Sequence, residues 1–453
     1  MADQQGARPA QLDRSGLRSG WTTGACATAA TTAAYTALLG GEFPDPVTIT
    51  LPRGHRPSLA LAVEGSGDGW AMAGVVKDAG DDPDVTHGAL LRATVHRAAS
   101  GSGVTFSAGS GVGTITLPGL PLAVGEPAIN PVPRQMMREH IAAVAQQLGG
   151  TQDVAVEISV DDGEEIARST WNPRLGILGG LSILGTTGVV VPYSCSAWID
   201  SIRRGIDVAR AVGHDHVAGC TGSTSERVAI AEHGLPDTAL LDMGDFAGAV
   251  LKYLRRHPVP RLSVVGGFAK MSKLAAGHLD LHSGRSQVDL ALLAQACIEA
   301  GASTEVAATV ATARTGLGAL QAAQAAGVPL GNLVAVRARE VALDVLGSAG
   351  VTVDTHRPCR DGRGARLPPA PQLSPAPMTG WRPARSQQRC RCAEYRCESL
   401  KPDAADVLPT RMTAVRRTPA AATWSAIVDN VPRSTTSPGW LAQATTAAGQ
   451  SDP

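Results

Sequence analysis

The second half of the chain alternates short apolar segments with helix-forming ones in a regular order. A strand, a helix and a further strand repeated in this way predict a mainly parallel sheet with right-handed crossovers. Residues 286–350 are rich in Ala and Leu and predict further packing helices. The expected elements are helix 197–212, strand 216–220, helix 223–233, strand 238–242, helix 246–256, strand 261–265 and a helix from Lys270.

Each loop that follows one of these strands carries residues suited to binding a ligand. Ligands bind outside the carboxyl ends of the strands in such sheets. Ser223 and Glu226 form the Ser-x-x-Glu pattern of a capping box. Any one loop could be a structural turn, but three at one edge favour a site for a cofactor or an anionic substrate. The residues concerned are Thr221, Gly222 and Ser223 in the first loop, Asp242 and Asp245 in the second, and Lys270 and Lys273 in the third.

Residues 172–196 form a glycine-rich stretch. Its two apolar runs, at 176–184 and 189–191, predict buried strands. Between them lie Gly185, Thr186, Thr187 and Gly188. Glycines allow a sharp turn and a close approach, and the hydroxyl and N–H groups could face an anion. A tight structural turn that leads into a helix is the alternative.

The first half of the chain predicts a mixed or antiparallel sheet with helices. An Ala-rich helix is expected over 25–39, with Thr22 or Thr23 as its cap and an anion-tolerant N-terminus. A further helix is expected over 134–148. The expected strands are 47–51, 59–63, 70–76, 90–96, 104–106 and 153–160, separated by Gly and Pro turns.

Residues 77–88 place four carboxylates within seven residues at the end of an expected strand. The alternatives are a turn rich in Asp, a loop for a divalent cation, a general base, or carboxylates that bind hydroxyls or a cation. The ligand spacing and terminal Glu of an EF-hand are not present.

Composition limits the partners and the compartment. With 40 basic and 40 acidic residues the formal net charge is zero, so neither nucleic acid nor a membrane surface is expected as a partner. We expect no signal peptide and no transmembrane segment. Cys26, Cys195, Cys220 and Cys297 are scattered, as expected for reduced thiols, so a soluble cytoplasmic protein is predicted.

His278 and His282 are four residues apart and are expected to share a helix face. Hydrogen-bonding or structural roles are favoured over metal binding, because no third ligand stands at a known spacing. From His356 the composition shifts to Arg, Pro, Ser and Gln, which predicts a disordered tail. Three cysteines within residues 390–397 of that tail lack a second cluster to complete a zinc site, so no metal site is expected.

Five segments of the chain form a recognisable set. They are RSGWTTGACA (18–27), VKDAGDDP (76–83), GEPAINP (125–131), GTTG (185–188) and LAAG (274–277). Together they resemble the CbiD family, the cobalt-precorrin-5B C1-methyltransferases of anaerobic cobalamin biosynthesis, in order from about residue 17 to residue 354. The resemblance implies transfer of a methyl group from S-adenosylmethionine to C1 of a cobalt-bound tetrapyrrole, giving cobalt-precorrin-6A, with cobalt only as part of the substrate.

The expected fold class is α+β. It comprises a flexible N-terminus (1–16), an N-terminal domain on a mixed or antiparallel sheet (17–165), a C-terminal βαβ-rich domain (166–354) and a disordered tail (355–453). The family has a short apolar strand after its last helix. Because the chain from His356 differs from that pattern, we expect this strand to be truncated or replaced.

The resemblance and the loop positions together suggest roles for particular residues. The substrate carries several carboxylates, for which cationic side chains and helix N-termini are natural partners. A base for the macrocycle is expected among Asp78, Asp81 and Asp82. The methyl donor is expected at Gly185, Thr186, Thr187, Gly188, Thr221, Gly222, Ser223, Asp242 and Asp245. The macrocycle is expected at Arg18, Thr22, Thr23, Lys270, Lys273, His278 and His282.

Two other functions fit parts of the pattern. A nucleotide-binding phosphotransferase could use the Gly/Thr loops, but the chain lacks the Gly-x-x-x-x-Gly-Lys-Ser/Thr motif. A non-enzymatic tetrapyrrole carrier would bind the macrocycle without needing S-adenosylmethionine. A homo-oligomer and transient contacts with neighbouring pathway enzymes are compatible with either enzyme or carrier.

Overall fold

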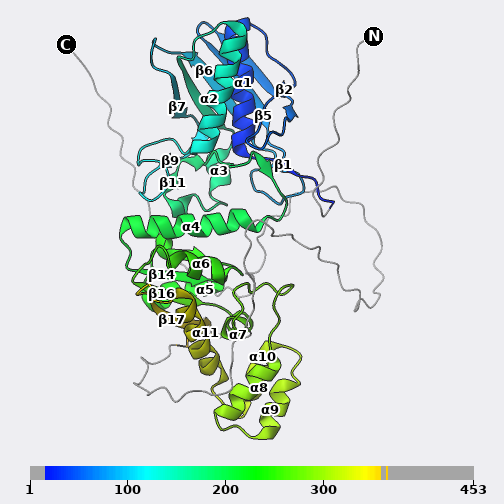
Figure 1. The fold of residues 1–453 in the computed structure, drawn as a ribbon, viewed down its shortest axis with the longest axis vertical. Helices are drawn as coiled ribbons and strands as arrows, with labels where there is room; N and C mark the ends of the chain where they lie inside the picture. Colours follow the sequence, from blue (N-terminus) through cyan, green and yellow to red (C-terminus); the bar gives the residue numbers. More distant parts are fainter. Residues whose placement is uncertain (1–15, 359–363, 366–453) are drawn as a thin grey trace, which may run out of the picture. The chain divides into compact units, whose positions relative to one another are not determined.

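The computed structural model describes residues 16–358 and 364–365 of the 453-residue chain. Its N-terminal half is built on a five-stranded sheet in the order β4-β5-β6-β10-β7, in which only the β10–β7 pair is parallel (Figure 1). The expected mixed sheet is therefore confirmed. Its strands are β4 (Val63–Gly67), β5 (Trp70–Val76), β6 (Leu90–Arg97), β7 (Val104–Ala108) and β10 (Val154–Val160).

Helices α1 (Thr23–Gly40) and α2 (Pro131–Leu148) pack against each other, and α1 packs on β5 and β6 (Figure 1). Small residues let α1 be buried on nearly all sides, since most of its Ala and Thr side chains have no access to solvent. As predicted, the Thr22 hydroxyl caps the helix by accepting a hydrogen bond from the Ala25 N–H at 3.2 Å. Gly41, with φ of +83°, ends it.

Short paired segments connect this sheet to the rest of the chain. The stretch over 172–196, expected to hold two continuous buried strands, instead contains two-residue strands that pair with distant partners. β13 pairs with β1, β11 with β9, and β12 with β8. The remaining short elements of this half are β1 (Gly20–Trp21), β2 (Val47–Thr48), β3 (Ser58–Leu59), β8 (Gly111–Val112), β9 (Thr114–Ile115), α3 (Gly163–Ala167), η1 (Pro173–Leu175), β11 (Ile177–Leu178), β12 (Gly180–Leu181) and β13 (Val189–Val190).

The C-terminal half contains the predicted parallel sheet, in the order β15-β14-β16-β17, with β18 antiparallel at its edge. Successive residues of its strands face opposite sides, and both sides are buried. Val217 and Leu241 belong to one apolar cluster, whereas Ala218 and Leu240 belong to another beneath α5. The strands are β14 (His216–Cys220), β15 (Leu240–Asp242), β16 (Arg261–Val265), β17 (Thr352–Pro358) and β18 (Gly364–Ala365).

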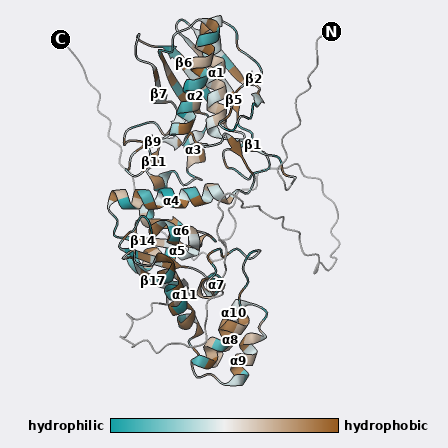
Figure 2. Ribbon diagram, viewed as in Figure 1, coloured by the Kyte–Doolittle hydropathy of each residue, from teal (hydrophilic) through white to brown (hydrophobic). Residues whose placement is uncertain are grey.

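Helices cover this sheet and extend beyond it (Figure 1). Hydrophobic and hydrophilic residues alternate along α4 (Figure 2), whose Ile202 and Ile206 enter the core. The helices are α4 (Cys195–Val212), α5 (Ser223–His233), η2 (Asp237–Ala239), α6 (Ala247–Leu254), α7 (Phe268–Ala275), α8 (Leu290–Glu299), α9 (Thr304–Ala311), α10 (Gly316–Ala325) and α11 (Leu330–Leu346).

One expectation about the end of the fold is wrong. The last strand is neither truncated nor replaced, because β17 runs beside β16 with Val353 opposite Leu262 and His356 opposite Val265. Val353 is fully buried in the core, so the segment supplies the apolar contact that the family pattern requires. The predicted disordered tail, apart from residues 355–358 and 364–365, lies outside the described residues.

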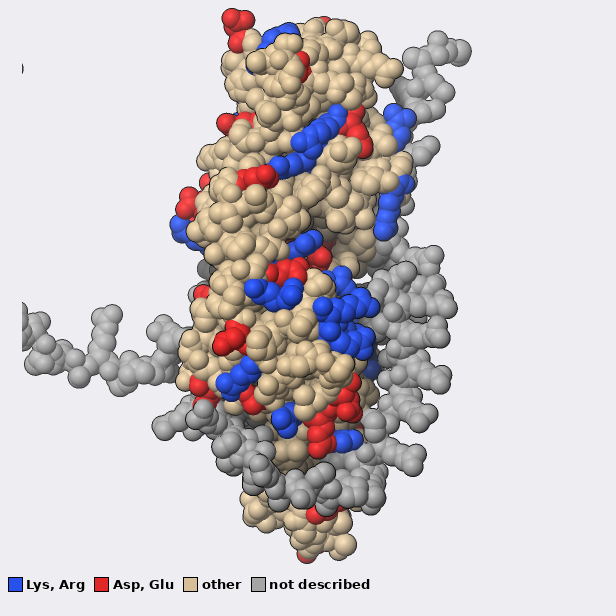
Figure 3. Space-filling view, turned by 60° about the vertical axis from the view of Figure 1, so that its left-hand side comes forward, with Lys and Arg blue, Asp and Glu red and all other residues tan. Residues whose placement is uncertain are grey.

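No helix in the described part of the chain is long and apolar enough to cross a membrane. Lys and Arg side chains and Asp and Glu side chains both occur on the surface face that Figure 3 shows, in line with the zero formal net charge.

Candidate functional site

The segment that contains Arg18 lies directly on the acidic loop. The Arg18 guanidinium binds both carboxylate oxygens of Asp78, with Nη2 to Oδ1 at 2.9 Å. The Arg18 N–H donates to Asp81 Oδ2 at 2.7 Å, and the Asp81 N–H donates to the Arg18 carbonyl at 2.9 Å. Gly20 and Gly80 allow this approach, because a Cβ on Gly20 would lie 2.0 Å from the Ala79 carbonyl carbon.

The carboxylates of this loop differ in electrostatic character. The hydrogen bonds from Arg18 lower the pKa of Asp78, which keeps it ionised and makes it a weak base. Burial raises the pKa of Asp82, which makes that carboxylate the stronger base. Asp84 is committed to structure, since it binds the fully buried Lys77 ammonium at 2.7 Å.

The glycine-threonine loop over 185–188 meets the start of α1. Leu184 N–H donates to the Thr23 hydroxyl at 2.9 Å, and Thr22 N–H donates to the Gly188 carbonyl at 3.1 Å. A Cβ on Gly185 would lie 2.2 Å from Thr22 Oγ1. The structure therefore places Thr22 and Thr23 beside the loop formed by Gly185, Thr186, Thr187 and Gly188. The Thr23 hydroxyl bonds to Leu184, whereas the Thr22 hydroxyl caps α1.

Residues 189–198 connect the acidic loop with the edge of the C-terminal sheet. The Tyr193 N–H donates to Asp82 Oδ1 at 2.7 Å. Five residues later, the Trp198 indole Nε1–H donates to the Asp242 carbonyl oxygen at 2.9 Å. One short segment thus contacts the candidate base at one end and a candidate donor-binding residue at the other.

At the carboxyl edge of the sheet the three predicted loops do converge. Lys270 Nζ lies 3.2 Å from Asp245 Oδ1 and donates to the Thr221 carbonyl at 3.2 Å. Burial, followed by the charge of Glu226, raises the pKa of Asp242. Thr221, Gly222, Ser223, Asp242, Asp245 and Lys270 therefore surround one end of the sheet.

The predicted capping box does not form. Helix α5 starts at Ser223 with Gly222 as its N-cap residue, so Ser223 stands one position too late to cap it. The Glu226 carboxylate instead binds the Arg174 guanidinium through two hydrogen bonds of 2.6 and 3.0 Å. Glu226 binds this charged partner from a distant segment and not the local backbone N–H, because the Arg174 and Glu226 side chains are both partly buried.

The helix face predicted for the two histidines is also wrong, although the hydrogen-bonding role favoured for them fits His282. Helix α7 ends at Ala275, so His278 and His282 lie in the following loop and share no helix face. His282 Nδ1 accepts the Gly284 N–H at 3.1 Å. Lys273 is buried with its ammonium donating to the Leu281 carbonyl at 2.9 Å, and burial lowers its pKa. Lys273 thus braces this loop.

Sequence reasoning missed Tyr193, Trp198 and Arg174. Tyr193 lies near the end of the glycine-rich stretch over 172–196, and Trp198 lies just after it. Only 3% of the residues in the chain are aromatic, and this scarcity is the signal that could have found them. Arg174 carried no local signal, because its partner Glu226 is 52 residues away.

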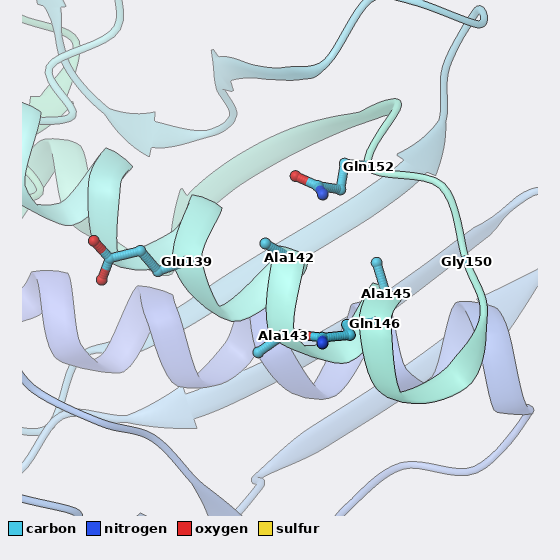
Figure 4. A pocket seen from close by; sticks show the side chains of 7 residues that line it. All are labelled: Glu139, Ala142, Ala143, Ala145, Gln146, Gly150 and Gln152. Atoms are coloured by element: carbon cyan, nitrogen blue, oxygen red, sulfur yellow. The ribbon is translucent and has the colours of Figure 1, made fainter.

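In the described part of the chain, neither of two cavities contains a predicted site residue. Within residues 16–358, no group of three or more His, Cys, Asp and Glu side chains is arranged to hold a metal ion. A cavity of about 590 Å³ lies at the end of α2 and holds none of the predicted site residues (Figure 4). Its lining consists of Glu139, Ala142, Ala143, Ala145, Gln146, Gly150 and Gln152.

Comparisons with known proteins show which family this chain resembles. The model of the family described as CbiD matches residues 10–192, and that described as CbiD, C-terminal domain, matches residues 280–363. The cobalt-precorrin-5B C(1)-methyltransferase of Paramagnetospirillum magneticum is 60% identical over 351 residues, which cover 78% of this chain and 98% of the relative. The protein of the same name from Rhodospirillum rubrum is 61% identical over 347 residues, covering 77% and 96%.

A crystal structure of the cobalamin biosynthesis protein cbiD from Archaeoglobus fulgidus is 30% identical, covers 59% of this chain and 83% of that chain, and superposes with a TM-score of 0.33. The family models and the near-complete coverage of relatives at about 60% identity agree with each other. This chain belongs to the CbiD family.

Proposed function

We propose that this chain methylates C1 of cobalt-precorrin-5B in cobalamin biosynthesis, with S-adenosylmethionine as the methyl donor and cobalt-precorrin-6A as the product. The observation that carries the reaction is the 60% identity to a cobalt-precorrin-5B C(1)-methyltransferase over 98% of that relative's length. Cobalt enters only as part of the substrate.

The donor side is assigned to the carboxyl edge of the C-terminal sheet. A carboxylate at a strand end suits the hydroxyls of a nucleoside ribose, and Asp242 occupies that position. Among the described residues, a Cβ placed on Gly222 or Gly267 would meet no atom within 4 Å, so the chain leaves open space at the start of α5 and of α7. This carboxylate with its glycine-lined space fits the adenosine part of S-adenosylmethionine.

The acceptor side is assigned to the acidic loop. S-adenosylmethionine supplies an electrophilic methyl group on a sulfonium when it is bound. The protein must align this donor with the ring carbon and exclude water. Asp82 is the base that takes a proton from the macrocycle, because its raised pKa favours proton acceptance more than the ion-paired Asp78 does.

Some of the other predicted residues belong to these two sides as well. Lys270 and Arg18 are the cationic groups for the substrate carboxylates, each beside its aspartate partner. Thr186 and Thr187 lie on the glycine-threonine loop, which precedes α4 in the chain. The proposal includes action in the cytoplasm, a homo-oligomer and transient contact with neighbouring pathway enzymes.

The test is anaerobic incubation of the full chain with cobalt-precorrin-5B and methyl-labelled S-adenosylmethionine, followed by mass spectrometry and NMR. A single labelled methyl group at C1 is expected. Asp82→Asn should lower kcat about 10²- to 10⁴-fold, the range for loss of a general base. Asp242→Asn should raise the KM for S-adenosylmethionine about 10- to 100-fold, as expected for loss of a charged hydrogen-bond acceptor.

Asp344→Asn is the matched control, because this carboxylate is exposed on α11 and should leave both constants unchanged. A folded wild-type protein that binds the macrocycle without transferring the label would establish a carrier instead. A protein that binds neither compound would overturn the whole assignment.

A further inference from the structure

Tyr193 has a backbone conformation that large side chains avoid. Its φ is +55°, in the left-handed region. In the described part of the chain, the other positions with positive φ are glycines, apart from Asp162. Aspartate tolerates this region through local hydrogen bonds, whereas tyrosine does not. The chain thus keeps an aromatic ring at a position where the backbone alone favours glycine.

Tyr193 is held in this conformation from three directions. Its N–H donates to Asp82 Oδ1 at 2.7 Å. The preceding Pro192 is buried and has a fixed φ, and the following Ser194 is the N-cap residue of α4. Strained backbone that is fixed in this way is typical of functional sites.

The side chain that this strained backbone carries is exposed to 59%. Because its N–H touches the Asp82 carboxylate, any molecule large enough to use Asp82 lies within reach of the phenol ring. Val191 and Trp198 of the same segment, and Leu184 a few residues before it, are exposed apolar side chains as well. A rigidly held aromatic group among apolar neighbours suits the face of a flat conjugated ring.

We propose that Tyr193 is a substrate-positioning residue whose ring stacks on the conjugated face of the tetrapyrrole, with the Asp82 carboxylate fixing the ring's place through the Tyr193 backbone N–H. The inference rests on the proposed function, since that function supplies the macrocycle. It gives Asp82 a positioning role in addition to that of base.

The test compares Tyr193→Leu, which removes the ring, with Tyr193→Phe, which keeps it. Both variants retain the backbone N–H. Tyr193→Leu should raise the KM and the Kd for cobalt-precorrin-5B about 5- to 100-fold, while Tyr193→Phe should stay within about threefold of wild type. The Kd for S-adenosylmethionine, measured by calorimetry, should not change. Leu317→Ala, on another exposed apolar side chain, is the control.

Two substitutions of Asp82 separate its role as base from its role in positioning Tyr193. Asp82→Asn keeps an oxygen that accepts the Tyr193 N–H, so it should lower kcat with little effect on macrocycle affinity. Asp82→Ala removes the acceptor as well and should also weaken macrocycle binding.

Macrocycle binding is measured by the quenching of protein fluorescence. It distinguishes failure of the positioning role from failure of the proposed function. If wild type methylates the macrocycle but Tyr193→Leu binds it equally well, the positioning role is refuted and the proposed function stands. If Tyr193→Phe is as impaired as Tyr193→Leu, stacking is refuted. If wild type binds the macrocycle without methylating it and Tyr193→Leu weakens binding, the proposed function fails and the positioning role holds. Absence of wild-type binding overturns both.

Discussion

Replacing Gly185 by alanine tests how closely the glycine-threonine loop must approach α1. Gly185 has a φ of +135°, which side chains of L-residues rarely adopt. Its added Cβ would also lie 2.2 Å from Thr22 Oγ1 and 2.5 Å from Thr22 Cβ, so something must move. Thr22 cannot move freely, because its hydroxyl caps α1.

The expected loss of stability has two parts. The backbone strain costs about 1–3 kcal/mol. Relieving the contact with Thr22 costs about 1–3 kcal/mol more, the range for an overpacked core. Together they remove about 2–6 kcal/mol from a free energy of unfolding that is typically about 5–15 kcal/mol.

Gly179→Ala is the control for a glycine with positive φ and no close contact. Gly179 has a φ of +84°, and among the described residues no atom lies within 4 Å of its added Cβ. Urea unfolding followed by circular dichroism should therefore show Gly185→Ala to be less stable than Gly179→Ala by about 1–3 kcal/mol. Equal losses in the two variants would refute the close approach between the loop and Thr22.

Three further predictions concern charges. Lys77→Met leaves Asp84 half-buried without its cation and should cost about 3–5 kcal/mol in urea unfolding. Burial raises the pKa of Asp84, but the hydrogen bonds and charge of Lys77 and Thr86 outweigh burial and lower that pKa. The free energy of unfolding of wild type should therefore decrease as pH falls below about 4, because Asp84 becomes protonated and its ion pair with Lys77 is lost. Lys77→Met should lose less over the same range. Burial lowers the pKa of His216 to about 4, so folding stability should fall as pH drops from about 6.5 toward 4, and His216→Asn should flatten that part of a thermal-melting profile. Arg174→Met strands the Glu226 carboxylate and should cost about 1–3 kcal/mol, whereas an unchanged urea midpoint would show that the pair adds nothing.

Periodic elements were predictable from the sequence. The bounds predicted for β14, α5 and β16 match the structure, because apolar strands and helices of ordinary length alternate there between clear turn residues. The start of α1 was predicted to within two residues, because Thr22 and Thr23 stood as alternative caps before an Ala-rich run. The convergence of loops at one sheet edge also followed, since parallel strands must end on the same side.

The failures have a common physical cause, which is long-range pairing that overrides a local signal. Glu226 binds Arg174 and does not form the predicted capping box. The stretch over 172–196 breaks into two-residue strands because its pieces pair with β1, β8 and β9, far away in the sequence. The change of composition at His356 hid the strand β17, whose residues 352–356 pair with β16.

The segment from Tyr193 to Trp198 links the two clusters that the proposed function assigns to one reaction. Five residues span at most about 17 Å when fully extended, and less here because α4 begins at Cys195. One end of this span binds the Asp82 side chain and the other binds the Asp242 carbonyl. Methyl transfer requires reacting atoms about 3–3.5 Å apart. A macrocycle at Asp82 and a nucleoside at Asp242 are together large enough to fill this span. In the proposed arrangement this segment therefore limits how far the macrocycle and the nucleoside lie from each other.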